Sequence, residues 1–249
     1  MSKRIRILGC NVDALTMEET INKVKEFINS KECVQHVVVN AGKINLIQSN
    51  HELRKLINDC PLINADGQSV VWASKFLKKP LPERVTGIDL FLNLVEVSAE
   101  YGYKLYFFGA KQEVVEKVVN IFQKKYPDLK VAGYRNGYFK EEESEQIAID
   151  IRNSGADILF VAFSSPKKEF WINKYMSIMK VPFAMGVGGS FDVVAGVTKR
   201  APLWMQKMGL EWFYRFIQEP RRMWKRYIIG NFKFCKLVLK SKFGNGEKL

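Results

Sequence analysis

The stretch Asp157-Ile158-Leu159-Phe160-Val161-Ala162 is an unbroken apolar run after its first residue, which is typical of a strand buried on both faces. Similar runs occur at Val37–Val39, Lys104–Phe108 and Pro182–Met185. Segments with helical periodicity separate these runs nearly to residue 195. Because buried strands alternate with helices, we predict an α/β fold in which helices cover both faces of a mostly parallel sheet.

The other elements follow from caps and periodicity. Thr16 and Glu19 form a capping box, which predicts the start of a helix that continues through Ser30. Short strands are expected at Ile5–Leu8, Leu62–Ile63 and Lys130–Ala132. Further helices are expected at Lys43–Gln48, Glu52–Asn58, from Gly67 to about Phe76, and at Leu90–Glu100, Glu113–Tyr126, Glu141–Asn153 (acidic and exposed) and Lys168–Met179. The whole is predicted to be Rossmann-like, with a strand order that stays open.

Polar and glycine-rich segments follow the predicted strands. They are Asn40, Asn64–Gly67, Gly109, Ser164–Pro166 and Gly186–Asp192. In open α/β sheets, ligands bind outside the carboxyl ends of the strands, near the N-termini of helices. We therefore expect the functional site at that edge of the sheet.

Three of these segments carry candidate chemistry. Asp66 is a candidate general base, although an isolated Asp-Gly pair is more often a helix-capping turn. Arg84 offers a guanidinium suited to a diphosphate, and Thr86 offers a hydroxyl, although Arg84 also fits a solvated surface charge. The glycines of Gly186–Asp192 let backbone N–H groups approach a phosphate, and a tight structural turn fits them equally well.

The sequence gives little support for a metal site, a redox-active cysteine pair or a dinucleotide-binding motif. The four widely spaced cysteines predict reduced cytosolic thiols, and the two histidines share no metal-ligand spacing. No acidic pair has DxD spacing, so we expect neither a metal nor a cofactor. Phe191 occupies the third glycine position of GxGxxG, and the first predicted strand is followed by Gly9 alone, so a dinucleotide oxidoreductase ranks last.

The C-terminal segment differs from the rest of the chain in charge. Of the net charge of +13, residues 199–242 carry +10, from 12 Lys and Arg against Glu211 and Glu219, whereas residues 1–198 carry +3. Aromatic residues alternate with these cations, and Pro220 is expected to separate helices. Because Trp and Tyr favour the lipid interface and cations attract anionic headgroups, we expect an anionic membrane surface as partner. Binding of single-stranded nucleic acid is less favoured, and packing on the domain is the other alternative, best suited to Trp204–Trp212.

This shift in charge predicts two parts, an α/β catalytic domain at residues 1–198 and a helical, basic appendage at residues 199–249. We see no apolar run long enough for a signal peptide or a membrane-spanning helix. The expectation is a cytoplasmic protein that is peripheral at the inner face of the cell membrane.

Taken in order, the motifs resemble the WecG/TagA/CpsF family of bacterial glycosyltransferases. The resemblance covers most of the chain, and seven or more blocks at family spacing are far more specific than any one of them. The blocks are Asn40, Asn64–Gly67, Arg84–Asp89, Gly109, Ser165–Glu169, Gly186–Asp192 with Gly196, Arg200–Pro202, Leu210–Trp212, Tyr214–Arg215 and Glu219–Arg222.

The resemblance implies an inverting, metal-independent transfer of a hexose or N-acetylhexosamine from a UDP-sugar to a polyprenyl-diphosphate-linked sugar, in teichoic acid or surface polysaccharide synthesis. Asp66 would be the general base that takes the proton from the acceptor hydroxyl. The resemblance also implies which residues bind the substrates. Arg84, Gly186, Gly188 and Gly189 would hold the departing diphosphate, Asn40 and Thr86 would shape the sugar pocket, and Gly109 and Asp192 would also contact the substrates. Arg215 and Arg222, with Lys225 or Arg226, would close over the donor or the lipid diphosphate.

Two positions depart from the family pattern. Lys168 stands where the family often has Gln, and Val38 stands where it often has a hydroxyl residue. Lys168 is a candidate contact for a phosphate or a carboxylated sugar, so the donor sugar stays open, with N-acetylmannosamine among the candidates. The alternative function is a nucleotide-sensing binding protein whose tail binds nucleic acid or lipid. Whether the protein forms a homo-oligomer also stays open.

Overall fold

The computed structural model describes residues 4–244, apart from the side chains of Arg222 and Arg226. Six strands form one sheet in the order β4-β3-β8-β7-β5-β6, and every neighbouring pair is parallel. The predicted α/β fold is therefore confirmed. The strands are β3 (Val34–Val39), β4 (Leu62–Ala65), β5 (Lys104–Gly109), β6 (Lys130–Arg135), β7 (Ile158–Ala162) and β8 (Phe183–Gly186).

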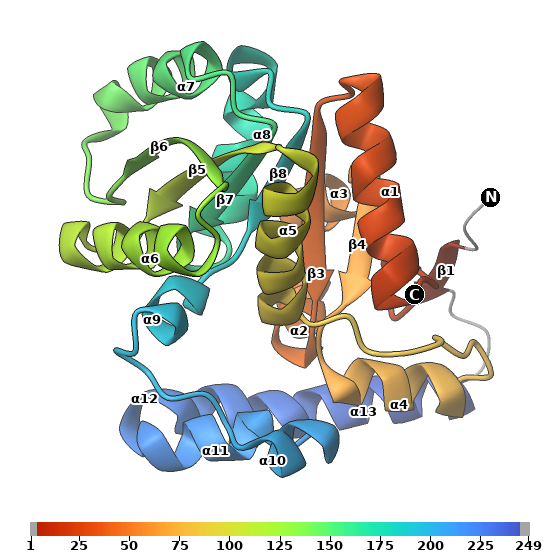
Figure 1. Cartoon of the computed structure of the whole chain (residues 1–249). Helices are drawn as coiled ribbons and strands as arrows, with labels where there is room; N and C mark the ends of the chain where they lie inside the picture. Colours follow the sequence, from red (N-terminus) through yellow and green to blue (C-terminus); the bar gives the residue numbers. More distant parts are fainter. Residues whose placement is uncertain (1–3, 245–249) are drawn as a thin grey trace.

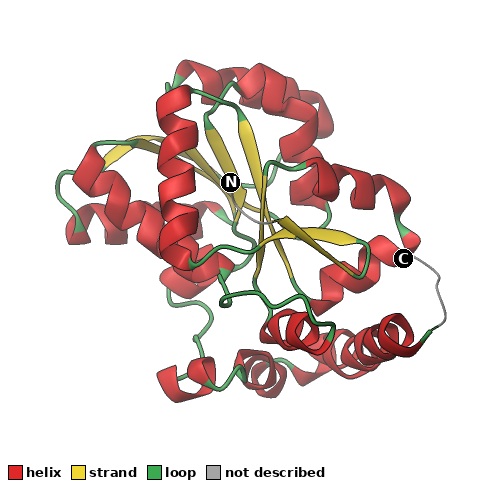
Figure 2. Cartoon of the chain, turned by 90° about the vertical axis from the view of Figure 1, so that its right-hand side faces the viewer, coloured by secondary structure: helices red, strands yellow, loops and turns green. Residues whose placement is uncertain are grey.

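Helices cover both faces of this sheet (Figures 1 and 2). One face packs against α1 (Met17–Ser30), α5 (Gly87–Tyr101), α6 (Gln112–Lys125) and α9 (Ser190–Val194). The other face packs against α2 (Ala41–Ser49), α3 (His51–Asp59), α7 (Ser144–Asn153) and α8 (Lys167–Met179). The capping box that begins α1 is present as predicted. Covering both faces explains why the strand sequences are almost entirely apolar.

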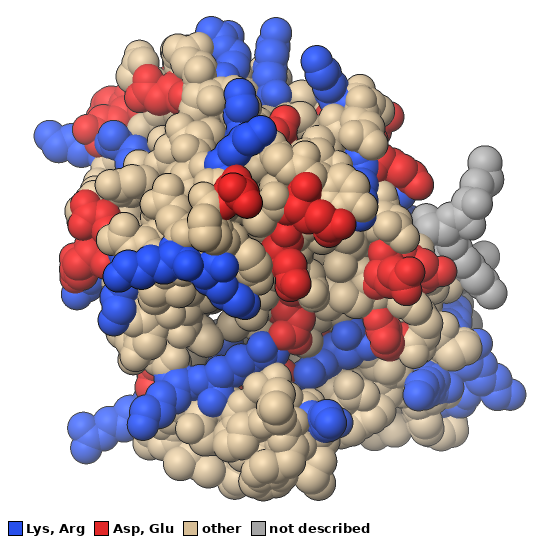
Figure 3. Space-filling view, in the orientation of Figure 1, with Lys and Arg blue, Asp and Glu red and all other residues tan. Residues whose placement is uncertain are grey.

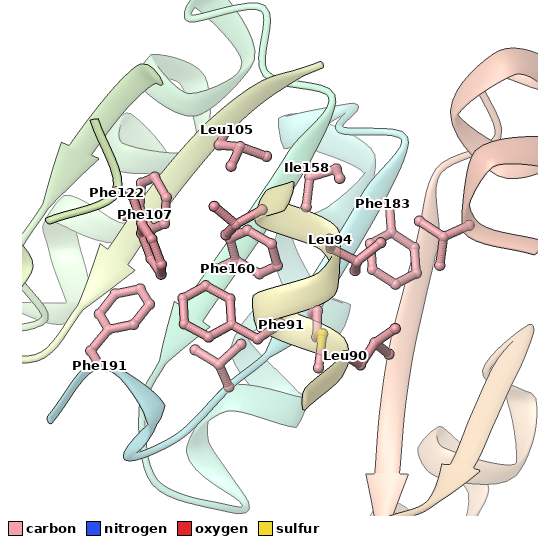
Figure 4. Packing of buried hydrophobic residues seen from close by; sticks show 14 of the residues in the cluster. Leu90, Phe91, Leu94, Leu105, Phe107, Phe122, Ile158, Phe160, Phe183 and Phe191 are labelled. Carbon is pink, nitrogen blue, oxygen red and sulfur yellow. The ribbon is translucent and has the colours of Figure 1, made fainter. Parts of the chain in front are cut away.

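Aromatic packing fixes α5 against the middle of the sheet. Phe91 of α5 is fully buried, and its ring centroid lies 4.7 Å from that of Phe160 on β7 (Figure 4). Phe191 of α9 lies 5.7 Å from Phe91 and 5.9 Å from Phe107 of β5. Phe122 of α6 completes the cluster. This packing holds the N-terminal end of α5 at the carboxyl edge of the sheet.

The N-terminal strand, predicted at Ile5–Leu8 and found at Arg4–Ile7, lies outside the main sheet. β1 (Arg4–Ile7) pairs with β2 (Cys10–Asp13) in a separate antiparallel hairpin, closed by Leu8 and Gly9 with positive φ angles. Only alternate residues of β1 are buried, which suits a strand with one covered face. Asp13 joins the hairpin to the sheet, because its carboxylate accepts hydrogen bonds from Arg4 and from the backbone N–H of Ile63.

The acidic helix near residue 150 is also less exposed than predicted. A short 3-10 turn, η1 (Glu141–Glu143), precedes α7. Ile147, Ala148 and Ile151 of α7 are buried in the cluster that includes Trp171 and Ile172 of α8. The acidic side chains lie on the outer face of α7. The number of acidic residues therefore predicted an exposed helix, although the apolar face of α7 is buried.

The C-terminal segment forms a layer of helices across the carboxyl edge of the sheet (Figure 1). It comprises α10 (Leu203–Lys207), α11 (Glu211–Gln218), α12 (Pro220–Trp224), the π-helical turn η2 (Lys225–Ile229) and α13 (Gly230–Phe243). Pro220 begins a new helix, as predicted. The helix α4 (Gln68–Phe76) lies beside α13, where Lys242 donates a hydrogen bond to the carbonyl of Phe76. Among the described helices, none is long and apolar enough to cross a membrane.

The last helix of this layer, α13, packs against α2 of the α/β domain. Phe234 and Val238 of α13 are buried in the cluster that includes α2, and Asn45 donates a 2.7 Å hydrogen bond to the carbonyl of Gly230. The segment 204–212, named as the part of the tail best suited to packing on the domain, is buried there at Met205, while the side chain of Trp204 is 59% exposed. The division of the chain at residues 198 and 199 remains a prediction.

Candidate active site

Three neighbouring strands bring the predicted polar segments to one edge of the sheet. Asp66 follows β4, Asn40 follows β3, and the loop Gly186–Gly189 begins at the end of β8. A Cβ atom on Gly67 would lie only 3.2 Å from Cβ of Asn40, so the first two loops are in contact. Parallel pairing of these strands is what gathers residues as far apart in the sequence as Asn40 and Gly189.

Asp66 is a half-buried carboxylate held through one oxygen. Its Oδ1 accepts a 3.0 Å hydrogen bond from the backbone N–H of Gly87, the first residue of α5. Among the described side chains, which exclude those of Arg222 and Arg226, no hydrogen-bond donor contacts Oδ2. A carboxylate oriented in this way has one oxygen available to accept a proton from a bound hydroxyl.

Arg84 and Thr86 belong to a charged network that joins α5 to the C-terminal layer. Arg84 Nη1 lies 2.8 Å from Glu211 Oε2, and Glu211 Oε1 lies 3.3 Å from Arg200 Nε. Arg200 also pairs with both carboxylate oxygens of Asp89, at 2.7 and 2.8 Å. Thr86 is buried, caps α5 and donates its hydroxyl to Asp89. Burial raises the pKa of Asp89, but the hydrogen bonds from Arg200 and Thr86 outweigh burial and hold this pKa below its usual value.

A second charged pair is buried between β3 and α8. Lys43 Nζ lies 2.6 Å from Glu169 Oε1 and donates a further hydrogen bond, 2.7 Å long, to the carbonyl of Val38. The side chains of Lys43 and Glu169 are 6% and 2% exposed. Burial raises the pKa of Glu169, but the charges of Lys43 and Lys168 outweigh burial and hold that pKa below its usual value. Lys43 stands in the first turn of α2, whose N-cap is Asn40.

Lys168 lies along the glycine loop. A Cβ atom on Gly186 would stand 2.5 Å from Cδ of Lys168, so any other residue at position 186 would require this lysine side chain to move. The ammonium group lies 3.7 Å from Glu169 Oε1 and 3.5 Å from the place that a Cβ atom on Gly188 would take. The structure therefore holds a cation over the loop that was predicted to bind a phosphate.

Arg215 and Asp192 line a cavity of about 70 Å³ between the glycine loop and the C-terminal layer. The other described residues that line it are Gly189, Val193, Thr198, Gln218, Glu219 and Met223. Arg222 belongs to α12, but its side chain lies outside the described residues, so its predicted contact stays a prediction. Within residues 4–244, no three His, Cys, Asp or Glu side chains converge as they would to hold a metal ion.

Comparison with known proteins identifies the family. The family described as Glycosyl transferase WecG/TagA/CpsF family matches residues 5–248. The chain belongs to this family. It is 34% identical over 238 residues to the N-acetylglucosaminyldiphosphoundecaprenol N-acetyl-beta-D-mannosaminyltransferase of Staphylococcus aureus (strain MW2), covering 95% of this chain and 91% of the relative. The protein of the same name from Bacillus spizizenii is 35% identical over 191 residues, covering 77% and 73%.

Membership in the WecG/TagA/CpsF family confirms the predicted glycosyltransferase. In this protein, Gly109 lies far from Asp66. Gly109 ends β5 and Asp66 follows β4, and β3, β8 and β7 lie between these two strands in the sheet. A Cβ atom on Gly109 would meet the backbone of Ala162 at 2.8 Å, and its φ angle is +123°, so close packing of β5 on β7 accounts for this glycine. Its predicted role in substrate binding stays a prediction.

Several residues around the site of this WecG/TagA/CpsF protein were not predicted individually. Lys43 is one, since a lysine in a helix gives no sequence signal of burial. His36 was expected at the surface or in packing, and the structure places it in packing, where its Nε2 meets Asn64 Oδ1 at 2.9 Å. Burial lowers the pKa of His36 to about 4, so its ring is neutral at pH 7. Arg200, Asp89 and Glu211 were visible only as members of family blocks.

Proposed function

We propose that this protein transfers an N-acetyl-β-D-mannosaminyl group from a UDP-linked donor to N-acetylglucosaminyl-diphospho-undecaprenol, with inversion at the anomeric carbon. The relatives that match over most of the chain carry this acceptor and this sugar in their names. The observation that carries the proposal is the half-buried Asp66 carboxylate, which is anchored at Oδ1, has no described donor at Oδ2, and precedes the glycine that packs on Asn40.

In the proposed reaction, Asp66 Oδ2 takes the proton of the acceptor hydroxyl as its oxygen attacks the anomeric carbon. The bond between that carbon and the donor diphosphate breaks, and UDP leaves with the electron pair. Attack on the face opposite UDP inverts the configuration, so an α-linked donor gives the β product. Because one carboxylate suffices for this proton transfer, the site needs no second acid.

Cations at the same edge would stabilise the departing diphosphate. Lys168 lies over the glycine loop, and Arg215 lines the adjoining cavity. Arg84 uses Nη1 for Glu211 and Nη2 for the carbonyl of Gln206, which leaves further N–H groups of its guanidinium for a phosphate oxygen. We assign the sugar to the side of Asn40 and Thr86, where α2 and α5 begin.

The proposal includes docking on an anionic membrane, where the lipid-linked acceptor is found. Most of the large apolar side chains that are exposed come from α10–α13 and α4: Trp72, Phe76, Leu203, Trp204, Met208, Trp212, Phe213, Ile217, Trp224, Ile228, Ile229, Phe232, Leu239 and Phe243. Figure 3 shows Lys and Arg side chains along the boundary between this layer and the α/β domain. Exposed aromatic residues beside cations are suited to the interface between lipid and water.

The reaction is tested by UDP release from UDP-N-acetylmannosamine with a short-chain N-acetylglucosaminyl-diphospho-lipid. We expect turnover only when the acceptor is present, and Asp66→Asn should lower kcat by at least about 100-fold. Asp59→Asn, which changes an exposed carboxylate at the end of α3, is the matched control and should keep the wild-type rate. A normal rate in Asp66→Asn would remove Asp66 from the mechanism.

Membrane docking is tested separately by co-sedimentation with vesicles that contain anionic lipid. The full chain should sediment with these vesicles and not with neutral ones, and Phe232→Ala, which removes an exposed ring from α13, should weaken that binding. Full competition by RNA, without vesicle binding, would instead favour a nucleic-acid-binding tail.

A further inference from the structure

Two charged side chains, Glu211 of the C-terminal layer and Arg200 just before this layer, contact the segment 84–89 at its two ends. Glu211 binds Arg84 at one end through a 2.8 Å contact. Arg200 binds Asp89 at the other end through two contacts of 2.7 and 2.8 Å. Glu211 and Arg200 also contact each other at 3.3 Å, so the four residues form one continuous chain of ion pairs.

The gripped segment contains the backbone group that orients the candidate base. Gly87 lies between Arg84 and Asp89, and its N–H donates to Asp66 Oδ1. The backbone N–H of Val85 donates to the carbonyl of Ala65, one residue before Asp66. The position of the carboxylate therefore depends on a segment that is held at one end by Glu211 of the C-terminal layer and at the other by Arg200, just before the layer.

The charges of this network are balanced and shielded. It contains two guanidinium groups and two carboxylates, and the side-chain exposure of its members ranges from 16% for Arg84 to 35% for Asp89. Partial burial makes these pairs stronger than fully exposed ones. Glu211 is the central member, because both Arg84 and Arg200 contact it. If Glu211 lost its charge, the guanidinium groups of Arg84 and Arg200 would repel each other without a carboxylate between them.

We propose that Glu211, together with Arg200, is a positioning residue for glycosyl transfer: it clamps the segment 84–89 so that Gly87 holds Asp66 in its reactive orientation. The inference rests on the proposed function in one respect, which is that Asp66 is the base. It makes the docked state of α11 a condition for a correctly oriented carboxylate, since Glu211 stands in the first turn of that helix.

The first test measures the clamp without any turnover. Hydrogen–deuterium exchange is followed in a peptide that covers residues 84–89, in the wild type, in Glu211→Gln and in Glu100→Gln. The Gln variant keeps the shape of the side chain and removes its charge, so exchange in this segment should become about tenfold faster. Glu100→Gln removes an exposed carboxylate from the other end of α5 and should match the wild type. Unchanged exchange in Glu211→Gln would overturn the clamp.

The second test is kinetic. Glu211→Gln should lower kcat about tenfold or more, with a smaller change in the KM for the UDP-sugar, and Glu211→Asp should recover part of kcat. Because the clamp acts as one unit, kcat of the double variant Arg200→Gln/Glu211→Gln should be no lower than kcat of the less active single variant. Losses that multiply, or a kcat within twofold of the wild type in Glu211→Gln, would overturn the positioning role. Absence of turnover in the wild type would overturn the proposed function alone, because exchange still reports on the clamp.

Discussion

Replacing Lys43 by methionine should destabilise the protein strongly, because the change leaves the carboxylate of Glu169 buried without its nearest cation. The two groups lie 2.6 Å apart, with exposures of 6% and 2%. Removing one partner of a buried ion pair typically costs about 3–5 kcal/mol. Lys168 remains 3.7 Å from the same carboxylate oxygen and compensates in part, so we expect about 3 kcal/mol. For a chain of this length, that loss corresponds to a fall in Tm of about 6–12 °C.

The loss should depend on pH in a defined direction. In the wild type, the pKa of Glu169 lies below its usual value, so this carboxylate stabilises the fold above its unfolded pKa and the contribution disappears as pH falls through the folded pKa. Without Lys43, we expect burial to raise that pKa instead, so the variant loses stability as pH rises. The difference in unfolding free energy between the two proteins should therefore widen from about pH 4 to about pH 7.

Urea denaturation at both pH values measures this difference. Lys55→Met, which removes an exposed lysine from α3, is the matched control and should stay within about 0.5 kcal/mol of the wild type. The double variant Lys43→Met/Glu169→Leu should recover much of the stability, because it removes both buried charges. Equal stability of Lys43→Met and the wild type at pH 7, or a difference that does not change with pH, would refute this account of the pair.

Three further changes test other parts of the fold. Burial holds the pKa of His36 at about 4, so the wild type should lose up to about 3 kcal/mol as pH falls from about 6.5 to 4, and His36→Gln should lose less over the same range in urea titrations. Gly109→Ala should cost about 1–3 kcal/mol in thermal unfolding, because its φ angle is +123° and the new Cβ would meet the backbone of Ala162; a Tm equal to the wild type would contradict the packing role. Phe234→Ala should cost about 3–5 kcal/mol and expose α13 to protease, whereas Phe232→Ala, at a position 74% exposed, should leave Tm unchanged and weaken vesicle binding.

Much of the secondary structure could be predicted because each buried strand is a local apolar run. The run 157–162 and its counterparts correspond to β3, β5, β7 and β8, and alternation with helices indicated the parallel sheet. The hairpin of β1 and β2 could not be assigned in the same way. Its first strand, Arg4–Ile7, is only four residues long, and local sequence does not show which sheet such a strand joins. The order of the strands depends on long-range packing and has no local signature.

The candidate site could be predicted only where one residue follows one strand. Asp66, Asn40 and the glycine loop fall together because the ends of parallel strands share an edge. Lys43 and Glu169 are 126 positions apart, and Arg84 and Glu211 are 127 apart, so no spacing rule relates them. Such pairs follow from tertiary contacts, which the pattern of a single sequence does not encode.

The place of β8 in the sheet has a consequence for the growing polypeptide. β8 is the last strand in the chain, yet it lies between β3 and β7 and joins the pair β4-β3 to the group β7-β5-β6. During synthesis, the edges of β3 and β7 that pair with β8 therefore remain unpaired until residues 183–186 have left the ribosome. A message truncated before residue 183 would leave both edges open to pairing with other chains, which favours aggregation. The glycine loop arrives with the same strand, so no nascent fragment can assemble the site before the sheet is whole.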